Sequence, residues 1–195
     1  MMKRAKSKIR IVLTALVLTA ASSCSHDYVP KPAGFVRIDL PEKKYKQYTG
    51  DLPYSFEYPE YCRIEADEEN NAEPFWINIV FPSLKGKIHI SYKKINGNLF
   101  TLTEDCRTLA YKHTIKAEAI DDHTIQMKDK KVYGMLYDIH GNVASSVQFF
   151  LTDSTRNFLR GSLYFNTQPN KDSLAPVIDF CREDILHFIE TFIWK

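Results

Sequence analysis

Residues 132–165 read VYGMLYDIHGNVASSVQFFLTDSTRNFLRGSLYF, and three runs of this stretch are rich in β-branched and aromatic residues. Such residues are favoured in β-strands. The runs cover 132–139, 143–151 and 158–165, and the short segments between them are rich in turn-forming residues. The stretch therefore predicts an antiparallel meander, which a weaker strand over 124–127 extends.

The residues before this meander predict further strands. An alternating run covers 35–38, and an aromatic run covers 54–58, with 62–65 as its expected hairpin partner. Two β-rich runs, 75–81 and 87–92, follow each other closely and are expected to pair as a second antiparallel hairpin.

Two helices complete the prediction. Thr101-Leu102-Thr103-Glu104 has the pattern of a capping box and predicts a helix over 101–117. The last helix is expected to start near Asp172 or Ser173, with Pro176 in its first turn. Its apolar stripe repeats at helical spacing and consists of Leu174, Val177, Ile178, Cys181, Ile185, Phe188, Ile189 and Phe192. This stripe must cover the sheet, so the fold class is α+β, an antiparallel β-sheet flanked by helices.

The N-terminus has the pattern of an export signal. Five basic residues precede an apolar run over 11–21, which is about half the length that a membrane span needs. The run ends in small residues before Cys24, as in a lipobox, so we expect cleavage between Ser23 and Cys24 and lipidation of Cys24. The alternative is a plain secretory signal that happens to be followed by a cysteine.

These patterns divide the chain into three parts. We expect a lipoprotein signal peptide over 1–23, an extended tether over 24–34 and a single α+β domain over 35–195. Lipid chains on Cys24 would hold the domain to a membrane. Ser25 follows in place of the aspartate that retains lipoproteins at the inner membrane, which favours the outer membrane and a domain that faces the periplasm.

Composition excludes several classes of function. The chain has 26 Lys and Arg against 24 Asp and Glu, and loss of the five basic residues of the signal leaves 21 basic against 24 acidic. There is no basic stripe or nucleic-acid recognition motif, so we expect no nucleic-acid partner. Isolated glycines at 86, 97, 134 and 161 form no phosphate-binding loop, and no cofactor is expected.

Cysteines and histidines show no metal-ligand spacing. Cys62, Cys106 and Cys181 allow at most one disulfide and contain no C-x-x-C pair. Cys106 and Cys181 fall on the apolar sides of predicted helices, which indicates packing. The histidines are scattered, so no metal site is expected; they are His26, His89, His113, His123, His140 and His187.

A catalytic triad can be imagined but has little support. Its members would come from Ser145, Ser146, Ser154, His140 and Asp153, yet no G-x-S-x-G elbow accompanies them. Ser145 and Ser146 are explained more simply as neighbouring residues of a strand, and Asp153 and Ser154 as residues of a turn. His113 lies on the inner side of a predicted helix. We therefore predict no catalytic residues and no enzyme activity.

Aromatic residues make up 13% of the chain, which is enough to supply both a core and a binding surface. Most of them are expected in the core. The sequence does not show which of the following lie on the surface instead: Trp76, Tyr92, Tyr111, Tyr133, Tyr137, Tyr164 and Trp194.

Several longer strings resemble one family. They are PKPxGFxRIDLP over 30–41, PYSFEYP over 53–59, ASSVQFFLTDST over 144–155 and LRGSLYFN over 159–166. In these the chain resembles the gliding motility lipoprotein GldD family of Bacteroidetes-type bacteria. The resemblance implies a lipoprotein of the outer membrane that faces the periplasm and serves gliding and type IX secretion, without known catalysis. Of the family's functional residues, only the lipidated cysteine carries over, onto Cys24. The order of elements also resembles the PsbP-like α/β/α sandwich.

Two functions remain open at this level. The first is a non-catalytic accessory or assembly factor that binds other envelope proteins of the gliding and secretion apparatus, with no small-molecule substrate. The second is a periplasmic hydrolase, or a lipoprotein that binds a small ligand or the cell wall. An exposed apolar patch would favour the first, whereas a polar pocket with converging titratable groups would favour the second.

Overall fold

The structure is a computed structural model and describes residues 38–167 and 169–195. The signal peptide, the cleavage site at Ser23 and Cys24, the tether and nearly all of the strand expected over 35–38 lie outside the described residues. Ile38, the last residue of that expected strand, is not in a strand.

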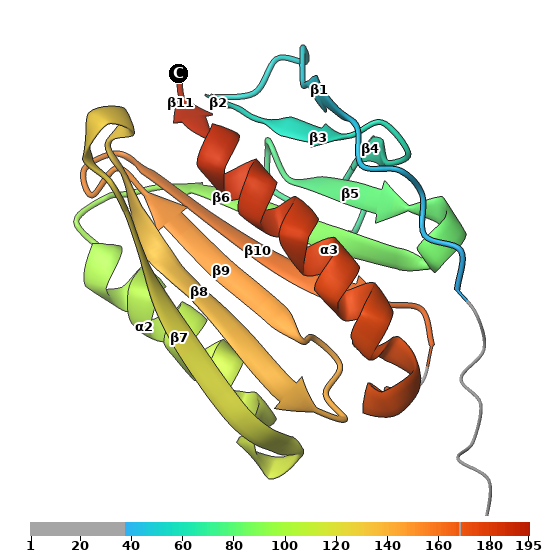
Figure 1. Cartoon of the computed structure of the whole chain (residues 1–195). Helices are drawn as coiled ribbons and strands as arrows, with labels where there is room; N and C mark the ends of the chain where they lie inside the picture. The colour runs from blue at the N-terminus through green and yellow to red at the C-terminus, as the bar shows by residue number, and fades with distance from the viewer. Residues whose placement is uncertain (1–37, 168) are drawn as a thin grey trace, which may run out of the picture. The chain divides into compact units, whose positions relative to one another are not determined.

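The described residues form a seven-stranded antiparallel sheet with the order β4-β5-β6-β10-β9-β8-β7 (Figure 1). Two small sheets, β1 with β3 and β2 with β11, lie beside it. The strands are β1 (Tyr45–Gln47), β2 (Tyr54–Ser55), β3 (Glu57–Pro59), β4 (Arg63–Ala66), β5 (Ile77–Phe81), β6 (Gly86–Lys94), β7 (Ala117–Met127), β8 (Val132–Gly141), β9 (Val147–Thr152), β10 (Asn157–Phe165) and β11 (Ile193–Trp194). The helices are α2 (Leu99–Tyr111) and α3 (Lys171–Thr191), with short 3-10 turns at Pro82–Leu84, Lys112–Ile115 and Lys128–Lys130.

The main core lies between the sheet and α3, which crosses the face that Figure 1 turns toward the viewer. Phe188 of α3 packs against Phe56 and Phe149, with ring centroids 4.6 and 5.7 Å apart. Gly161 permits this packing, because a Cβ there would lie 2.2 Å from the Phe149 ring. A larger residue at this strand position would displace an aromatic ring of the core.

A second, smaller core lies on the opposite face under α2. Leu102, Cys106 and Ala110 of this helix are buried against Phe150 and Phe158 of the sheet. Phe150 and Phe158 stack with centroids 5.4 Å apart. In the described part of the chain, no helix covers the same face of β5 and β6, so polar side chains line it there.

The main sequence predictions of the fold are confirmed. The fold is α+β, the expected hairpin is β5 with β6, and the expected meander is β7 to β10 in consecutive antiparallel order. The C-terminal stripe faces the main core as predicted. Strand-forming residues and the apolar stripe of one amphipathic helix were sufficient to predict these elements.

Two local predictions about the strands are wrong. The aromatic run over 54–58 divides into β2 and β3, and β3 pairs with β1 instead of with 62–65. Residues 63–66 pair with β5. Phe56, between the two short strands, is fully buried against α3, so contacts distant in sequence override the local hairpin.

Both helices also begin earlier than predicted. α2 starts at Leu99 after Asn98 and ends at Tyr111, so Thr101 lies inside the helix, and the Glu104 carboxylate pairs with Arg107 at 2.9 Å instead of capping the helix. α3 starts at Lys171, where the Asn170 side chain caps it by accepting from the Ser173 amide. Pro176 is therefore the sixth residue of the helix, beyond the first turn.

Candidate functional site

The structure places His140 and Ser146 in the lining of one small hollow with Asp121, but it separates them from Asp153 and Ser154. His140 lies at the end of β8 and contacts Asp121, with His140 Nε2 and Asp121 Oδ2 3.0 Å apart. Ser145 and Ser146 are buried before β9, and the Ser145 hydroxyl donates to the Val147 carbonyl at 3.4 Å. None of these side chains contacts Asp153 or Ser154 through a hydrogen bond between described residues.

Asp153 organises the turn between β9 and β10. Its Oδ1 accepts hydrogen bonds from the amides of Thr155, Arg156 and Asn157 at 2.7 to 2.9 Å, and its Oδ2 accepts from the Asn157 side chain. Burial opposes ionisation, but these bonds outweigh it and hold the pKa of Asp153 below its usual value. Ser154 adopts a left-handed conformation with φ 65° in the same turn. Both residues therefore have a role in turn geometry.

The three cysteines of the described domain are free and buried. Burial raises the pKa of the Cys62 thiol, and it raises the pKa values of Cys106 and Cys181 to about 12. Cys106 packs under α2 and Cys181 under α3, as predicted. His113 is half-buried after α2, where burial and then Arg160 lower its pKa. The three thiols act as packing residues, because a thiol with a raised pKa is a poor nucleophile.

A row of polar side chains crosses the part of the sheet that α2 leaves open. The register places Asn78 of β5 opposite His89 of β6, His89 opposite Ser162 of β10, and Ser162 opposite Gln148 of β9. Residues opposite one another in adjacent strands point to the same face. Because the neighbouring apolar residues in these strands face the main core, this row points away from it. The four side chains are called the polar row below.

Three members of the polar row are buried with an unsatisfied polar atom. These atoms are Asn78 Oδ1, Ser162 Oγ and Gln148 Nε2, and the residues are 9%, 0% and 2% exposed. Gln148 Oε1 accepts from Arg160 at 2.7 Å, which leaves Gln148 Nε2 as the free donor. An unpartnered buried polar group costs about 1 to 3 kcal/mol, so three in one row are unusual for a purely structural surface.

His89 of the polar row lines a hollow of about 840 Å³ at the same face. The side chains that matter for its chemistry are Lys87, His89, Arg160 and Tyr164, with Lys85 and Glu69 at its margin. We call this site the open-face hollow. Its size lies within the range of small-molecule sites.

The charged groups around the hollow are partly fixed. Asp67 Oδ2 lies 2.6 Å from His89 Nε2. Burial opposes ionisation of Asp67, but the Glu69 amide and His89 outweigh it and hold the pKa of the Asp67 carboxyl below its usual value. Asp67, His89 and Ser162 together suggest a triad, yet Ser162 is fully buried and makes no hydrogen bond with His89. The arrangement can therefore bind a polar ligand, but it presents no accessible nucleophile.

A second surface feature is the outward side of α2. Phe100, Arg107 and Tyr111 recur at i, i+7 and i+11, which places them on one stripe of the helix. Phe100 is 78% exposed, and the Arg107 guanidinium lies 5.9 Å from the centroid of the Tyr111 ring. Ile115 follows the helix and is 92% exposed. We call Phe100, Arg107 and Tyr111 the α2 outer stripe; aromatic residues and arginine are the types that dominate binding energy at protein interfaces.

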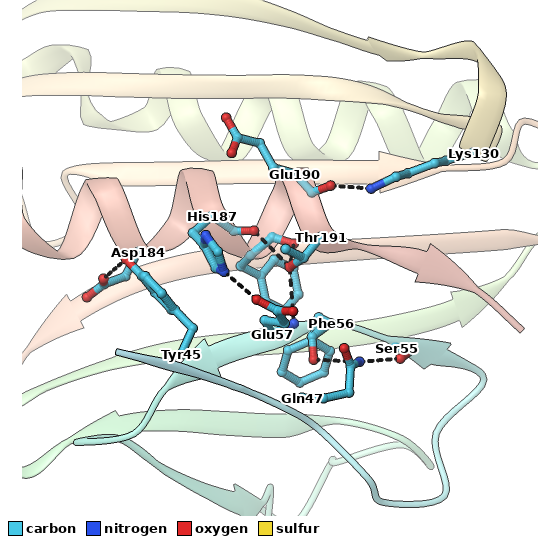
Figure 2. Close-up of polar contacts among 11 residues, drawn as sticks. Tyr45, Gln47, Ser55, Phe56, Glu57, Lys130, Asp184, His187, Glu190 and Thr191 are labelled. Carbon is cyan, nitrogen blue, oxygen red and sulfur yellow. Dashed lines mark hydrogen bonds and ion pairs between the residues drawn. The ribbon is translucent and has the colours of Figure 1, made fainter. Parts of the chain in front are cut away.

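A third polar cluster joins the start of the described domain to α3 (Figure 2). Tyr45 of β1 stacks on His187 with ring centroids 3.6 Å apart and donates to Asp184 Oδ1 at 2.8 Å. His187 Nε2 lies 2.8 Å from Glu57 Oε2, and the Glu57 amide donates to Thr191 Oγ1 at 3.1 Å. The cluster fixes β1 and β3 against α3.

The centre of this cluster is the carboxylate of Asp184. It accepts from Lys43 Nζ at 2.8 Å and from the Tyr61 hydroxyl at 2.5 Å, besides Tyr45. Burial and the hydrogen bond to Asp184 raise the pKa values of the Tyr45 and Tyr61 hydroxyls. Asp184 therefore ties three parts of the N-terminal segment to one turn of α3.

None of these three clusters was predicted from the sequence. The polar row joins residues from 78 to 162, and its members become neighbours only through strand register. The alternation of Lys87, His89 and Ser91 with isoleucines on β6 shows that they face away from the core, and this was the available signal. The outward spacing of Phe100, Arg107 and Tyr111 was also present in the sequence.

No three His, Cys, Asp or Glu side chains in 38–167 and 169–195 are grouped as metal ligands. Neither helix of this part of the chain is long and apolar enough to span a membrane.

Comparison with known proteins identifies the family. No curated protein matches the chain. Among solved structures, the solution structure of cyanobacterial PsbP from Synechocystis sp. PCC 6803 is similar, with 12% identity and a TM-score of 0.46, over 84% of this chain and 99% of that one. The sequence profile of the gliding motility lipoprotein GldD family matches residues 25–194, as the sequence resemblance predicted. The chain therefore belongs to the gliding motility lipoprotein GldD family and is a lipoprotein of the cell envelope associated with gliding motility.

Proposed function

We propose that this protein is a non-catalytic assembly factor that binds another envelope protein of the gliding motility and type IX secretion machinery. In this proposal, lipid chains on Cys24 hold it to the outer membrane, the tether 24–34 follows, and the domain 35–195 faces the periplasm. The signal peptide 1–23 is removed between Ser23 and Cys24.

The α2 outer stripe is the observation that carries the proposal. Phe100 exposes most of a large apolar side chain on a helix whose inner side is already packed. Exposed aromatic residues with an adjacent arginine are typical of sites that a protein partner covers. The residues singled out for catalysis instead take part in turns, strand packing and ion pairs, which supports a role without chemistry.

Substitution on the stripe tests the proposal. Phe100→Ala combined with Tyr111→Ala should abolish gliding and secretion while the protein accumulates normally, because exposed substitutions change stability little. Ile193→Ala is the matched control, since Ile193 is an apolar residue of β11 that is 50% exposed on another part of the domain. Gliding and secretion are measured at equal protein level in both strains. Normal motility of the double variant would contradict docking through α2.

A second candidate function, a lipoprotein that binds a small ligand, is favoured by the open-face hollow. It is compatible with assembly through α2, because the two features involve different residues.

A further inference from the structure

We propose that the open-face hollow binds a small organic oxyanion, a carboxylate or a phosphate, between Lys87 and Arg160. The site is independent of docking through α2, and it adds a ligand to the proposed assembly function.

The two cations lie on either side of the polar row. Lys87 is two residues before His89 on β6, and Arg160 is two residues before Ser162 on β10. Because the strands are antiparallel, the two cations lie on opposite sides of the polar row and on the same face of the sheet. Successive rows on one face are about 7 Å apart, so each long side chain can reach a group that sits over His89 and Ser162. An anion in that place would have a positive charge on each side.

The two cations are available for a ligand. Among the described residues, neither Lys87 nor Arg160 has an acidic side-chain oxygen within 4 Å, although Lys87 is near enough to Asp67 to help lower the pKa of that carboxyl. Arg160 donates only one hydrogen bond there, from Nη2 to Gln148 Oε1, and this bond orients the guanidinium. Arginine held in this way has further N–H groups for an oxyanion. His89 is already paired with Asp67, and the Asp67 carboxylate, like that of Glu69, opposes an anion at this position.

The unsatisfied atoms of the polar row provide a second, independent argument for a polar ligand. Gln148 Nε2 and Ser162 Oγ are buried on the sheet face that holds both cations, next to Arg160 and His89, which line the hollow. Gln148 Nε2 can only donate, and the Ser162 hydroxyl can donate, so both suit the oxygens of an anion. Both atoms are buried, so a ligand in the hollow accepts from them only when neighbouring side chains move aside, and it would then satisfy groups that otherwise destabilise the fold.

The remaining lining predicts an apolar part of the ligand. Val80 and Tyr164 lie on either side of Lys87 in the same row. A ring or short aliphatic chain attached to the anion would contact them. Glu69 at the margin opposes an anion and should weaken its binding.

Binding can be measured by the fluorescence of Trp76, whose ring centroid lies 5.6 Å from that of His89. The purified full chain carrying Trp194→Phe has Trp76 as its one tryptophan. Phenyl phosphate, benzoate and inorganic phosphate are titrated against it, with benzyl alcohol as a neutral control. Saturable binding of phenyl phosphate or benzoate, weakened by salt and absent for benzyl alcohol, is expected. Inorganic phosphate should bind more weakly, because it lacks the apolar part.

Three variants and one control test whether the change in Trp76 fluorescence comes from binding in the hollow. Lys87→Met and Arg160→Gln should each weaken binding at least tenfold, and Glu69→Gln should strengthen it. Lys112→Met, which removes an exposed lysine after α2, should leave binding unchanged. Arg160→Gln could disturb the polar row, so Lys87→Met is the decisive variant: Lys87 has no hydrogen-bonded partner among described residues, and its loss should leave the melting temperature unchanged. Absence of saturable binding, or equal binding by Lys87→Met, would overturn the proposal.

Discussion

Asp184→Asn is expected to loosen the N-terminal segment of the domain from α3. The side chain of Asp184 is 1% exposed and its carboxylate accepts from Lys43, Tyr45 and Tyr61. Asparagine keeps the shape and one acceptor oxygen but removes the charge. Lys43, whose side chain is 23% exposed, then loses its buried counter-ion.

The size of the effect follows from these contacts. Removing one partner of a buried ion pair costs about 3 to 5 kcal/mol. Lys43 keeps Glu183 at 3.3 Å, the Phe180 carbonyl at 2.7 Å and partial contact with solvent, so the lower end applies. A loss of about 3 kcal/mol corresponds to a melting temperature roughly 6 to 12 °C lower for a domain of this size.

The assay is thermal unfolding of the purified full chain, followed by circular dichroism. Lys43→Met is made alone and with Asp184→Asn, so that a double-mutant cycle isolates the pair. The coupling free energy should be about 1 to 3 kcal/mol, and the double variant should be less destabilised than the sum of the single variants. A melting temperature within 1 °C of the parent for Asp184→Asn, or zero coupling, would refute the assignment of Asp184 as the clamp.

Three further outcomes are expected. Phe188→Asp should destabilise the domain by several kcal/mol, because it places a carboxylate among the rings of Phe56 and Phe149, and an unchanged melting temperature would contradict that packing. Cys24→Ala should abolish lipid labelling and leave an uncleaved or mislocalised precursor; normal labelling would disprove lipidation at this residue. Polar substitutions at the sequence-suggested positions should each support gliding and secretion at equal protein level, and one stable, inactive variant would indicate catalysis or ligand binding at that position. These substitutions are His113→Gln, His140→Ala, Ser145→Ala, Ser146→Ala, Asp153→Asn and Ser154→Ala.

The strands and the last helix could be predicted because their signals are local. β-branched and aromatic residues mark β8, β9 and β10 as strands, and the stripe that includes Phe188 shows how α3 lies on the core. The capping-box pattern at Thr101 was misleading, since the same residues also fit inside a helix in which Glu104 pairs with Arg107. Local pattern does not determine the first residue of a helix.

The candidate sites could not be predicted because they depend on pairing between distant strands. Alternation assigns His89 and Ser162 to the outward side of their strands, but it does not say that β6 and β10 are neighbours. A shift of one residue in that pairing would move Ser162 away from His89. In the same way, Lys43 and Asp184 are 141 residues apart and meet only after the N-terminal segment docks on α3.

Photo-crosslinking at Phe100 in living cells tests docking through α2 most directly. A benzophenone amino acid replaces Phe100 in one strain and Ile193 in another, and both strains must accumulate the protein equally. We predict that position 100 yields one abundant covalent adduct with an envelope protein of the gliding and secretion machinery, and that position 193 does not. No adduct from position 100, or the same adducts from both positions, would contradict the account.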